Sequence, residues 1–372
     1  MTPTASFRIA VLPGDGIGHE VMPPCLAVLE AVVRRIGGFD LTFDLLDAGA
    51  ETYRSTGTAL PARTLRACAD ADAILLAAMG LPHIRYADGT EIAPQLDLRF
   101  EFGLYAGLRP IRAIAGIPHL LSDPRAAAID FVLVRESTEG LFASRGKGTV
   151  TDDREARDTL LITRDVSERL FDFSLRLAAQ RRDAGGKGRV TCVDKANVFK
   201  SFAFFRRIFE ERAAMHPDLR CDTAYVDACA LNMVTRPWEF DVLVTENMFG
   251  DILSDLAAGL VGGMGYAPSA DIGDDKAVFQ PAHGSAPDIA GSGRANPTAM
   301  ILSSAIMLDW LGTRHRVPEL RRGARMIERA VDRAFVDGRL RTCELGGDAG
   351  TKAVANAVLA AIEALPAESG PV

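Results

Sequence analysis

The sequence predicts an α/β fold built on a largely parallel sheet. Short apolar runs of strand length alternate along the chain with stretches of helical periodicity, and the first of these runs ends in a glycine-rich turn. Strands that alternate with helices favour a parallel sheet, because parallel neighbours need a crossover connection. The chain has 372 residues, which is enough for two lobes or for one large domain.

The first unit is a strand, a turn and a helix. Phe7–Leu12 is apolar, Pro13–Gly18 contains three glycines, and a helical pattern runs from Glu20 to Arg35. The turn departs from the G-x-G-x-x-G fingerprint, so a standard Rossmann site is not expected here. We expect a tight turn at Gly14–Gly18, and anion binding by its backbone is the alternative.

The rest of the chain continues this alternation. The later buried-strand candidates are Ala73–Ala77, Phe131–Val134, Val190–Val193, Thr223–Val226 and Val242–Thr245. The last third is mainly helical, over Pro297–Trp310, Pro318–Phe335 and Thr351–Leu365. The glycine-rich segment 185–188 is expected to form a loop before a strand.

Composition and charge argue against several classes of partner. A formal charge of −7 and the absence of a long basic run argue against nucleic acid. No apolar run reaches membrane-spanning length, and residues 1–6 lack a signal-peptide pattern. The six cysteines form no Cys-x-x-Cys pair and no zinc-type cluster, which favours free thiols in a reducing compartment. We therefore expect a cytoplasmic protein that binds neither nucleic acid nor membrane.

Two acids one helical turn apart are the most informative feature of the chain. Asp251 and Asp255 share one face of a predicted helix whose apolar neighbours indicate partial burial, where unpaired charges are costly. A hard cation between them, Mg²⁺ or Mn²⁺, would explain the pair. A solvated helix face that carries two acids is the alternative. Asp227, which ends the predicted strand Thr223–Val226, is a candidate third carboxylate.

Three arginines are candidate carboxylate ligands. Arg99 and Arg109 lie in one segment, and Arg135 follows the predicted strand Phe131–Val134, where α/β sheets place their ligands. Guanidinium groups bind carboxylates through two parallel hydrogen bonds, so three of them suit a small di- or tricarboxylate. Ordinary surface exposure is the alternative for each of them.

Lys195 and Asn197 follow the predicted strand Val190–Val193. A lysine at the carboxyl end of a strand and near other cations could have a lowered pKa and take part in proton transfer. An ordinary salt bridge is the alternative.

The loop 283–297 is rich in glycine and other small residues. Within it, Asp288 could accept hydrogen bonds from two ribose hydroxyls, and its charge would repel a 2′-phosphate. This chemistry favours NAD over NADP, and a capped surface loop is the alternative.

Taken together, these segments resemble the β-decarboxylating dehydrogenase family of isocitrate, 3-isopropylmalate, tartrate and D-malate dehydrogenases, nearer the tartrate and D-malate branch. The resemblance covers nearly the whole chain. The matching segments are 14–20, 108–110, 135–140, 194–197, 247–255, 283–297, 341–342 and 345–347, together with Asp227. So many ordered motifs in one chain make the resemblance specific.

The resemblance implies an isopropylmalate-dehydrogenase-like, two-lobed fold with a central mixed sheet rather than a standard Rossmann fold. One lobe, residues 1–108 and 257–372, would bind the cofactor. The other lobe, residues 109–256, would bind substrate and metal and form the dimer interface. The active site would lie between the lobes and be shared between the two subunits of a homodimer.

The resemblance also implies NAD- and metal-dependent oxidation, with decarboxylation, of a malate-like 2-hydroxy dicarboxylic acid. Asp251 and Asp255 would hold Mg²⁺ or Mn²⁺ together with Asp227 of the partner subunit. The catalytic residues would be Lys195 and Asp227, with Lys195 also supplied by the partner. The implied substrate contacts are Gln95, Arg99, Arg109, Arg135 and Asn197. The implied cofactor contacts are His283, Gly284, Ser285, Ala286, Asp288 and Asn296. A requirement for K⁺ stays open.

Two positions depart from the family pattern. Most relatives carry a tyrosine where Phe142 stands, and that tyrosine is taken as the acid that protonates the enol. Isopropylmalate enzymes usually carry leucine where Gln95 stands, and a buried amide beside an isopropyl group would leave polar atoms unpaired. D-malate or tartrate is therefore the expected substrate. The alternatives are 3-isopropylmalate and a non-catalytic regulatory subunit. Relatives that use NADP usually carry lysine and tyrosine where Asp288 and Ile289 stand.

Overall fold

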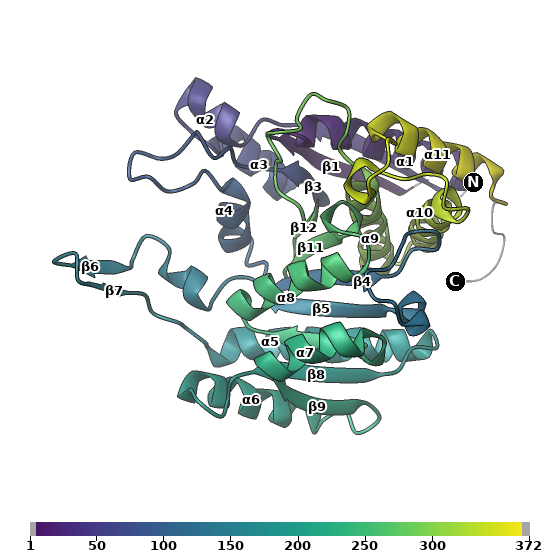
Figure 1. Cartoon of the computed structure of the whole chain (residues 1–372). Helices are drawn as coiled ribbons and strands as arrows, with labels where there is room; N and C mark the ends of the chain where they lie inside the picture. Colours follow the sequence, from purple (N-terminus) through teal and green to yellow (C-terminus); the bar gives the residue numbers. More distant parts are fainter. Residues whose placement is uncertain (1–4, 367–372) are drawn as a thin grey trace.

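A computed structural model describes residues 5–366 of the chain. Its main feature is one mixed sheet of ten strands, with helices on both faces (Figure 1). The strands are β1 Ala5–Gly14, β2 Phe39–Leu45, β3 Ala73–Ala78, β4 Ala106–Arg112, β5 Asp130–Glu136, β8 Arg189–Asp194, β9 Arg220–Tyr225, β10 Val242–Thr245, β11 Pro268–Ile272 and β12 Ala277–Pro281. They lie side by side in the order β2-β1-β3-β12-β11-β4-β5-β10-β8-β9.

The direction of the strands changes at the centre of the sheet. Strand β11 is antiparallel to β12 and to β4, and β4 is antiparallel to β5. All other pairings are parallel. The alternation of strands and helices therefore predicted the two outer parts of the sheet, whereas the resemblance correctly predicted the mixed centre.

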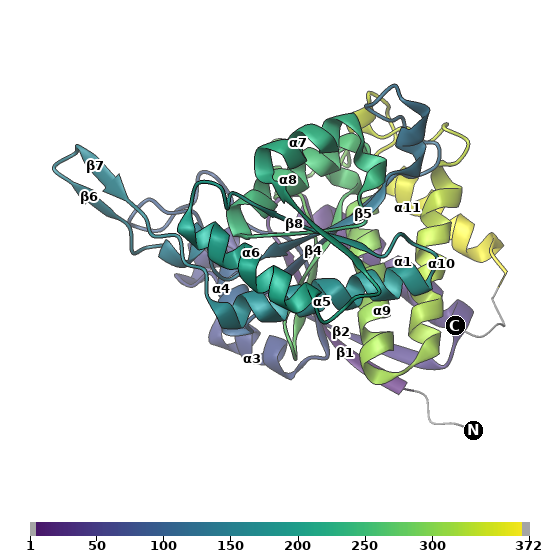
Figure 2. The ribbon, with the colours of Figure 1, turned by 90° about the horizontal axis from the view of Figure 1, so that it is seen from below.

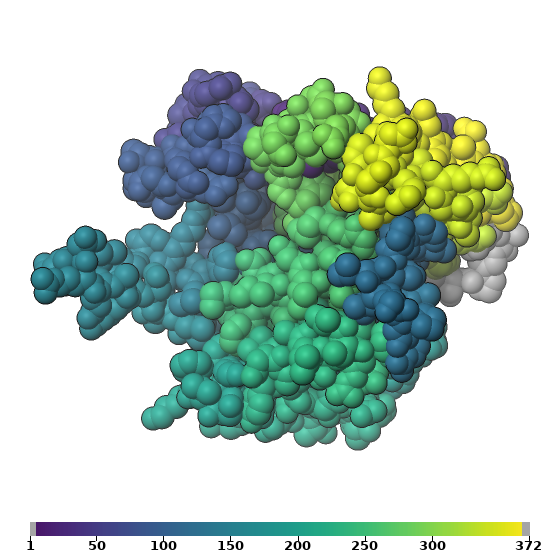
Figure 3. Space-filling model, viewed as in Figure 1, coloured from purple at the N-terminus to yellow at the C-terminus, as the bar shows by residue number. Residues whose placement is uncertain are grey.

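Most of the connections are helical. The helices are α1 Gly18–Ile36, α2 Ala50–Thr56, α3 Ala62–Asp70, α4 Pro94–Glu101, α5 Arg164–Asp183, α6 Lys200–Ala213, α7 Val226–Thr235, α8 Asn247–Leu260, α9 Thr298–His315, α10 Pro318–Phe335 and α11 Thr351–Ala364. A hairpin of β6 Thr149–Thr151 and β7 Glu155–Arg157 stands away from the body in every view (Figure 1, Figure 2 and Figure 3).

The core is divided by the sheet because alternate residues of a strand point to opposite faces. On β1, Ile9 and Val11 join a large cluster that includes residues of α1, α9 and α10, whereas Ala10 and Leu12 join a second cluster with residues of α3 and α4. A third cluster packs α7 and α8 against β5 and β10. Strands that are buried on both faces explain why their sequences are continuously apolar.

The predicted elements are present, with corrections at two boundaries that concern site residues. Arg135 was predicted to follow a strand ending at Val134, but it lies within β5, which continues to Glu136. Thr223–Val226 was predicted as a strand, but β9 ends at Tyr225 and Val226 begins α7. Asp227 therefore lies in the first turn of a helix, where the helix dipole favours a negative charge, rather than at the end of a strand.

The division into lobes at residues 108/109 and 256/257 stays a proposal. The first boundary falls within β4, the second falls within α8, and one sheet runs through both parts. Between residues 5 and 366, no helix is long and apolar enough to cross a membrane. The six cysteines are free thiols.

Candidate active site

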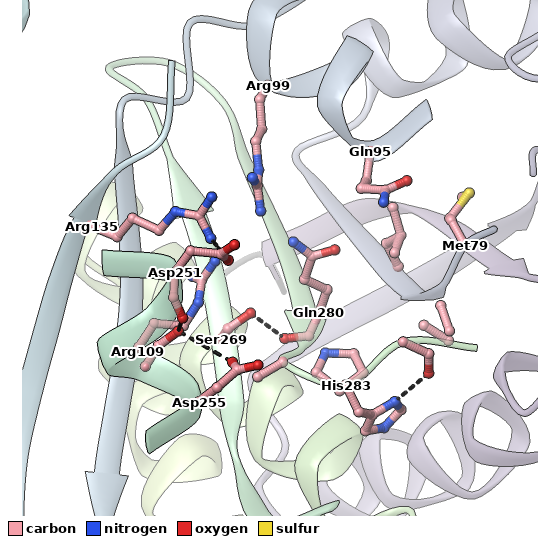
Figure 4. Close-up of a pocket in the computed structure, with 17 residues that line it drawn as sticks. Met79, Gln95, Arg99, Arg109, Arg135, Asp251, Asp255, Ser269, Gln280 and His283 are labelled. Carbon is pink, nitrogen blue, oxygen red and sulfur yellow. Dashed lines mark hydrogen bonds and ion pairs between the residues drawn. The ribbon is translucent and has the colours of Figure 1, made fainter. Parts of the chain in front are cut away.

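Six of the predicted substrate and metal residues surround one pocket of about 160 Å³ above the centre of the sheet (Figure 4). They are Gln95, Arg99, Arg109, Arg135, Asp251 and Asp255. The pocket also contains Ser269 of β11 and Gln280 of β12. Its volume is below the roughly 300–1,000 Å³ of sites for drug-sized ligands, so it suits a small acid.

Helix α4 supplies Gln95 and Arg99 from consecutive turns. Residues four apart share one face of a helix, so both side chains reach the pocket. Gln95 Oε1 is buried and has no hydrogen-bond partner within the described residues. An unpaired buried carbonyl oxygen is costly, and a donor on a ligand would satisfy it.

Arg135, near the end of β5, is fixed by the start of α8. Its Nε and one terminal nitrogen donate to Asn247 Oδ1 at 2.9 and 2.7 Å, and the other terminal nitrogen pairs with Asp251. Gly250 makes this approach possible, because a Cβ there would lie 2.6 Å from Arg135 Cβ. Burial, followed by the charge of Arg99, lowers the pKa of Arg135 to about 10, so the group stays charged at neutral pH.

The buried acid Asp271 was missed in the sequence. On β11, its carboxylate accepts hydrogen bonds from Arg99 Nε at 2.9 Å and from Gln280 Nε2 at 2.7 Å, and Arg109 approaches at 3.4 Å. Burial opposes its ionisation, but the charges of Arg99 and Arg109 hold its pKa below the ordinary value. An acid within the short, otherwise apolar segment 270–272 is the signal that could have revealed a buried ion pair.

The two acids of α8 lie on its exposed side, above a buried side that includes Leu253 and Ala257. Glu246 caps this helix by accepting hydrogen bonds from the backbone N–H groups of Phe249 and Met248. Burial and the neighbouring charge of Asp251 raise the pKa of Asp255. A cation between the carboxylates would relieve this repulsion, and the described part of a single chain contains no cluster of three metal-type ligands.

The predicted proton-transfer residues do not line this pocket. Lys195 Nζ forms an ion pair with Asp227 Oδ1 at 2.9 Å, and the Asp227 side chain is 68% exposed. The pair lowers the pKa of Asp227, mainly through the hydrogen bond from Lys195. Asn197 is exposed two residues further along. Within one chain, these residues therefore form a second, separate group.

The glycine turn and the loop 283–297 are held together by backbone contacts. Ile17 N–H donates to Ser285 C=O at 2.9 Å, and a Cβ on Gly16 would lie 2.1 Å from that oxygen. The buried Asp15 accepts hydrogen bonds from the N–H groups of Ala50 and Gly80 at 2.7 and 2.8 Å. The turn is thus a packing element, as the tight-turn interpretation expected.

Four of the six predicted cofactor residues line one or both of two pockets, and Ser285 and Asp288 line neither. His283 lines both the arginine pocket and a neighbouring pocket that also contains Ala286 and Asn296, and Gly284 lines the arginine pocket. Burial lowers the pKa of His283, and its Nε2 is buried without a partner in the described region. Ala286 has a φ of 36°, an uncommon backbone conformation for a residue other than glycine.

The remaining cofactor candidates differ in how they are engaged. Ser285 is buried and donates to Gly80 C=O, whereas Asp288 is exposed. The Asn296 side chain is already used, because its Nδ2 donates to Glu344 at 2.6 Å and its Oδ1 accepts from Thr298. Glu344, which the sequence reading did not select, lines the same pocket.

Phe142 lies beside the arginine pocket. The Arg135 guanidinium stands over its ring, 5.0 Å from the ring centre, in a cation–π contact. The ring has no hydroxyl group, so this position can orient Arg135 but cannot transfer a proton.

Comparisons with known proteins agree with this geometry. Residues 8–358 of the chain match the isocitrate/isopropylmalate dehydrogenase family. The 3-isopropylmalate/3-methylmalate dehydrogenase of Methanocaldococcus jannaschii is 42% identical over 94% of this chain and 97% of its own. The isocitrate/homoisocitrate dehydrogenase of Thermus thermophilus is also 42% identical, over 97% of this chain and 100% of its own. The structure of isocitrate dehydrogenase from Methylococcus capsulatus matches with a TM-score of 0.83 and 38% identity, covering 96% and 99% of the two chains.

Proposed function

The chain belongs to the isocitrate/isopropylmalate dehydrogenase family of oxidoreductases, and on this premise we propose that it uses NAD and a divalent metal to oxidise and decarboxylate a malate-like 2-hydroxy dicarboxylic acid. D-malate and tartrate are the proposed substrates. The observation that carries the proposal is the group of three buried arginines and two aspartates around one small pocket.

The residues present fit a divalent cation. Asp251 and Asp255 provide hard oxygen donors one helical turn apart, and burial together with the charge of Asp251 raises the pKa of Asp255, an effect that a cation between the carboxylates would oppose. When bound, Mg²⁺ or Mn²⁺ would act as a Lewis acid on the oxygen at the carbon that is oxidised. Asp227 of the partner subunit is the proposed third ligand.

The arginines would bind and orient the two carboxylates of the substrate. Within residues 5–366, Arg99 donates a hydrogen bond from Nε to Asp271 and none from its two terminal nitrogens, which can therefore face the pocket (Figure 4). Arg109 and Arg135 are held by internal partners, which pre-organises their remaining donors. Lys195 of the partner subunit would take the hydroxyl proton, directly or through Asp227.

The loop 283–297 is the proposed NAD site. His283 lies between the arginine pocket and the neighbouring pocket, so a dinucleotide in the second pocket would reach the substrate in the first. Hydride acceptance is the chemistry that NAD would supply there. The exposed Asp288 carboxylate is available to ribose hydroxyls.

We predict that Asp288→Lys weakens the use of NAD. Replacing the carboxylate with a cation removes the proposed acceptor for the ribose hydroxyls and favours a 2′-phosphate instead. The ratio of kcat/KM values for NAD and NADP would measure the change, with Asp348→Lys, on a loop outside both pockets, as the matched control. NAD kinetics that stay unchanged in the Asp288 variant would remove this residue from the cofactor site.

The two candidate types of substrate, D-malate or tartrate on one side and 3-isopropylmalate on the other, differ in the substituent on the third carbon. A polar substituent would satisfy the unpaired Gln95 Oε1, which favours D-malate or tartrate. Met79 in the same pocket and the names of relatives such as the Methanocaldococcus jannaschii enzyme favour 3-isopropylmalate. Relatives of 42% identity differ in the substrates named for them, so overall identity does not decide between the two.

We further propose a homodimer in which the partner covers α7 and α8. Leu231, Val234 and Ile252 are exposed apolar side chains on these helices, with exposed fractions of 64%, 45% and 62%. Apolar exposure grouped on neighbouring helices is typical of a protein interface. A cytoplasmic location is also proposed, supported by the free cysteines.

A substrate screen tests the proposal. The purified chain would be supplied with Mn²⁺, NAD and in turn D-malate, tartrate, 3-isopropylmalate and isocitrate, while NADH and CO₂ are followed in parallel. We expect NADH with a dicarboxylate and loss of all signal when the metal is chelated. Substrates that protect the chain from thermal unfolding without turnover would instead indicate a regulatory subunit.

A further inference from the structure

The buried carboxylate of Asp271 lies beneath the arginine pocket. Asp271 is 1% exposed and stands opposite Gly107 on β4, which in turn stands opposite Arg135 on β5. A Cβ on Gly107 would lie 3.2 Å from Asp271 Oδ1 and 2.5 Å from Ser137 Oγ. The glycine therefore leaves the space in which the acid reaches the arginines.

Four side chains of different segments bind this carboxylate. Oδ2 accepts hydrogen bonds from Arg99 Nε and Gln280 Nε2 at 2.9 and 2.7 Å. Oδ1 accepts weaker contacts from Arg109 and Ser137, both at 3.4 Å. Paired and hydrogen-bonded in this way, a fully buried carboxylate can remain charged.

The net charge that the protein offers to a substrate follows from matching each charged group at the pocket with a group of opposite charge. Asp251 and Asp255 together carry two negative charges, which balance a divalent cation although Asp251 also pairs with Arg135, and Lys195 balances Asp227 within their ion pair. The remaining charges are the three arginines and Asp271, so the built-in excess is two positive charges. A malate-type dicarboxylate carries two negative charges, and a tricarboxylate such as isocitrate carries three.

The hydrogen-bond donors of the arginines also favour a substrate with two carboxylates. Arg99 Nε donates to Asp271. One terminal nitrogen of Arg109 donates to the carbonyl oxygens of Leu108 and Ala270 at 3.0 and 3.1 Å. A third carboxylate in the pocket would have to compete for these donors with a carboxylate that is already buried beside them. Leaving any of these groups unpaired is costly because they are buried.

We propose that Asp271 is a specificity-determining residue that adapts the arginine cluster to substrates with two carboxylates rather than three. This inference rests on the proposed function, because it assumes that the arginines bind substrate carboxylates. It applies equally to D-malate, tartrate and 3-isopropylmalate, which all carry two.

The test compares Asp271→Asn with the parent enzyme. Asparagine keeps the shape and one acceptor oxygen but removes the charge. The measured quantity is the kcat/KM for the best dicarboxylate divided by that for isocitrate. We expect this ratio to fall by about tenfold or more, because one charge at this range shifts an ionic equilibrium by about one to three powers of ten. Asp275→Asn removes the same charge from the β11–β12 turn, where the side chain is 89% exposed, and should leave the ratio unchanged.

Two outcomes would overturn the inference, and they differ from failure of the proposed function. A folded Asp271→Asn enzyme with the parental ratio would show that the charge does not select substrates. If this variant does not fold, competitive inhibition of the parent decides, because succinate should bind more tightly than tricarballylate; equal inhibition would contradict the proposal. A parent enzyme that makes no NADH with any dicarboxylate would instead reject the proposed function itself, and this inference with it.

Discussion

The arginine pocket and the Lys195–Asp227 pair are built in opposite ways. The three arginines are buried and held by internal partners such as Asp271 and Asn247. Lys195 and Asp227 contact each other at the surface, outside the arginine pocket. The three arginines that would bind the substrate carboxylates thus lie around one pocket of a single chain, whereas Lys195, Asp227 and Asn197 lie outside that pocket and, under the proposed function, reach it from the partner subunit. Under the proposed function, assembly of the dimer would therefore control catalysis.

The largest effect on activity should come from removing one proposed metal ligand from each region, in separate variants that are then combined in one dimer. Asp251→Asn and Asp227→Asn should each lower kcat by about 10³-fold or more, because each removes a proposed metal ligand. A mixture of the two variants, unfolded and refolded together, should regain about a quarter of parental activity, since half of the dimers would contain one intact site. NADH production by single and mixed variants measures this. Activity that stays absent in the mixture would mean that both residues serve the same chain's site.

The next largest effect should be on stability, which a substitution in the arginine pocket should lower more than one in the Lys195–Asp227 pair. Arg109→Met leaves the buried Asp271 with one fewer counter-charge and should lower the free energy of unfolding by about 3–5 kcal/mol. Lys195→Met breaks an exposed pair, so its urea-unfolding midpoint should match that of the parent. Urea unfolding of both variants, at low protein concentration and without ligands, makes the comparison. Equal loss in the two variants would show that the exposed pair contributes as much to stability as the buried cluster does.

A smaller effect is expected at Phe142, which stands beside the arginine pocket in place of the tyrosine that most relatives carry. Phe142→Tyr would place a hydroxyl beside Arg135 and supply a proton donor, so the yield of CO₂ per hydride transferred should rise a few-fold. Parallel measurement of CO₂ and NADH gives this ratio, with Phe100→Tyr, an exposed aromatic on α4, as the control. An unchanged ratio would assign protonation to another group, and the partner's Lys195 would then be the first candidate.

The smallest effect concerns pH. Burial lowers the pKa of His283, so the unfolded chain binds its proton at a higher pH than the folded chain does. Stability should therefore fall as the pH drops below about 6.5, by up to about 1.4 kcal/mol per pH unit from this group. Unfolding in urea across pH 5 to 8 should show a shallower slope in His283→Gln than in the parent. His83→Gln, which changes an exposed histidine, should keep the parental slope.

Local patterns in the sequence predicted most of the fold. The apolar runs that became β1, β3, β5, β8 and β10 are continuous because both faces of the sheet are covered. Strands β2, β4, β11 and β12 of the large sheet were not predicted, and in β11 and β12 Pro268, Asp271 and Gln280 interrupt the apolar pattern. Gln280 lines the arginine pocket and Asp271 pairs with two of its arginines, so two of the residues that interrupt the strand pattern belong to the site.

The sequence by itself determined which residue types would bind an acid, a metal and a dinucleotide, because helical spacing and motif order are local properties of the chain. Only the tertiary structure decided how those groups are paired. Arg99 and Asp271 lie 172 positions apart and meet through strand order and the space left by Gly107. The same structure separates Lys195 and Asp227 from the pocket. Burial and charge pairing depend on distances across the fold, and no local pattern records those distances.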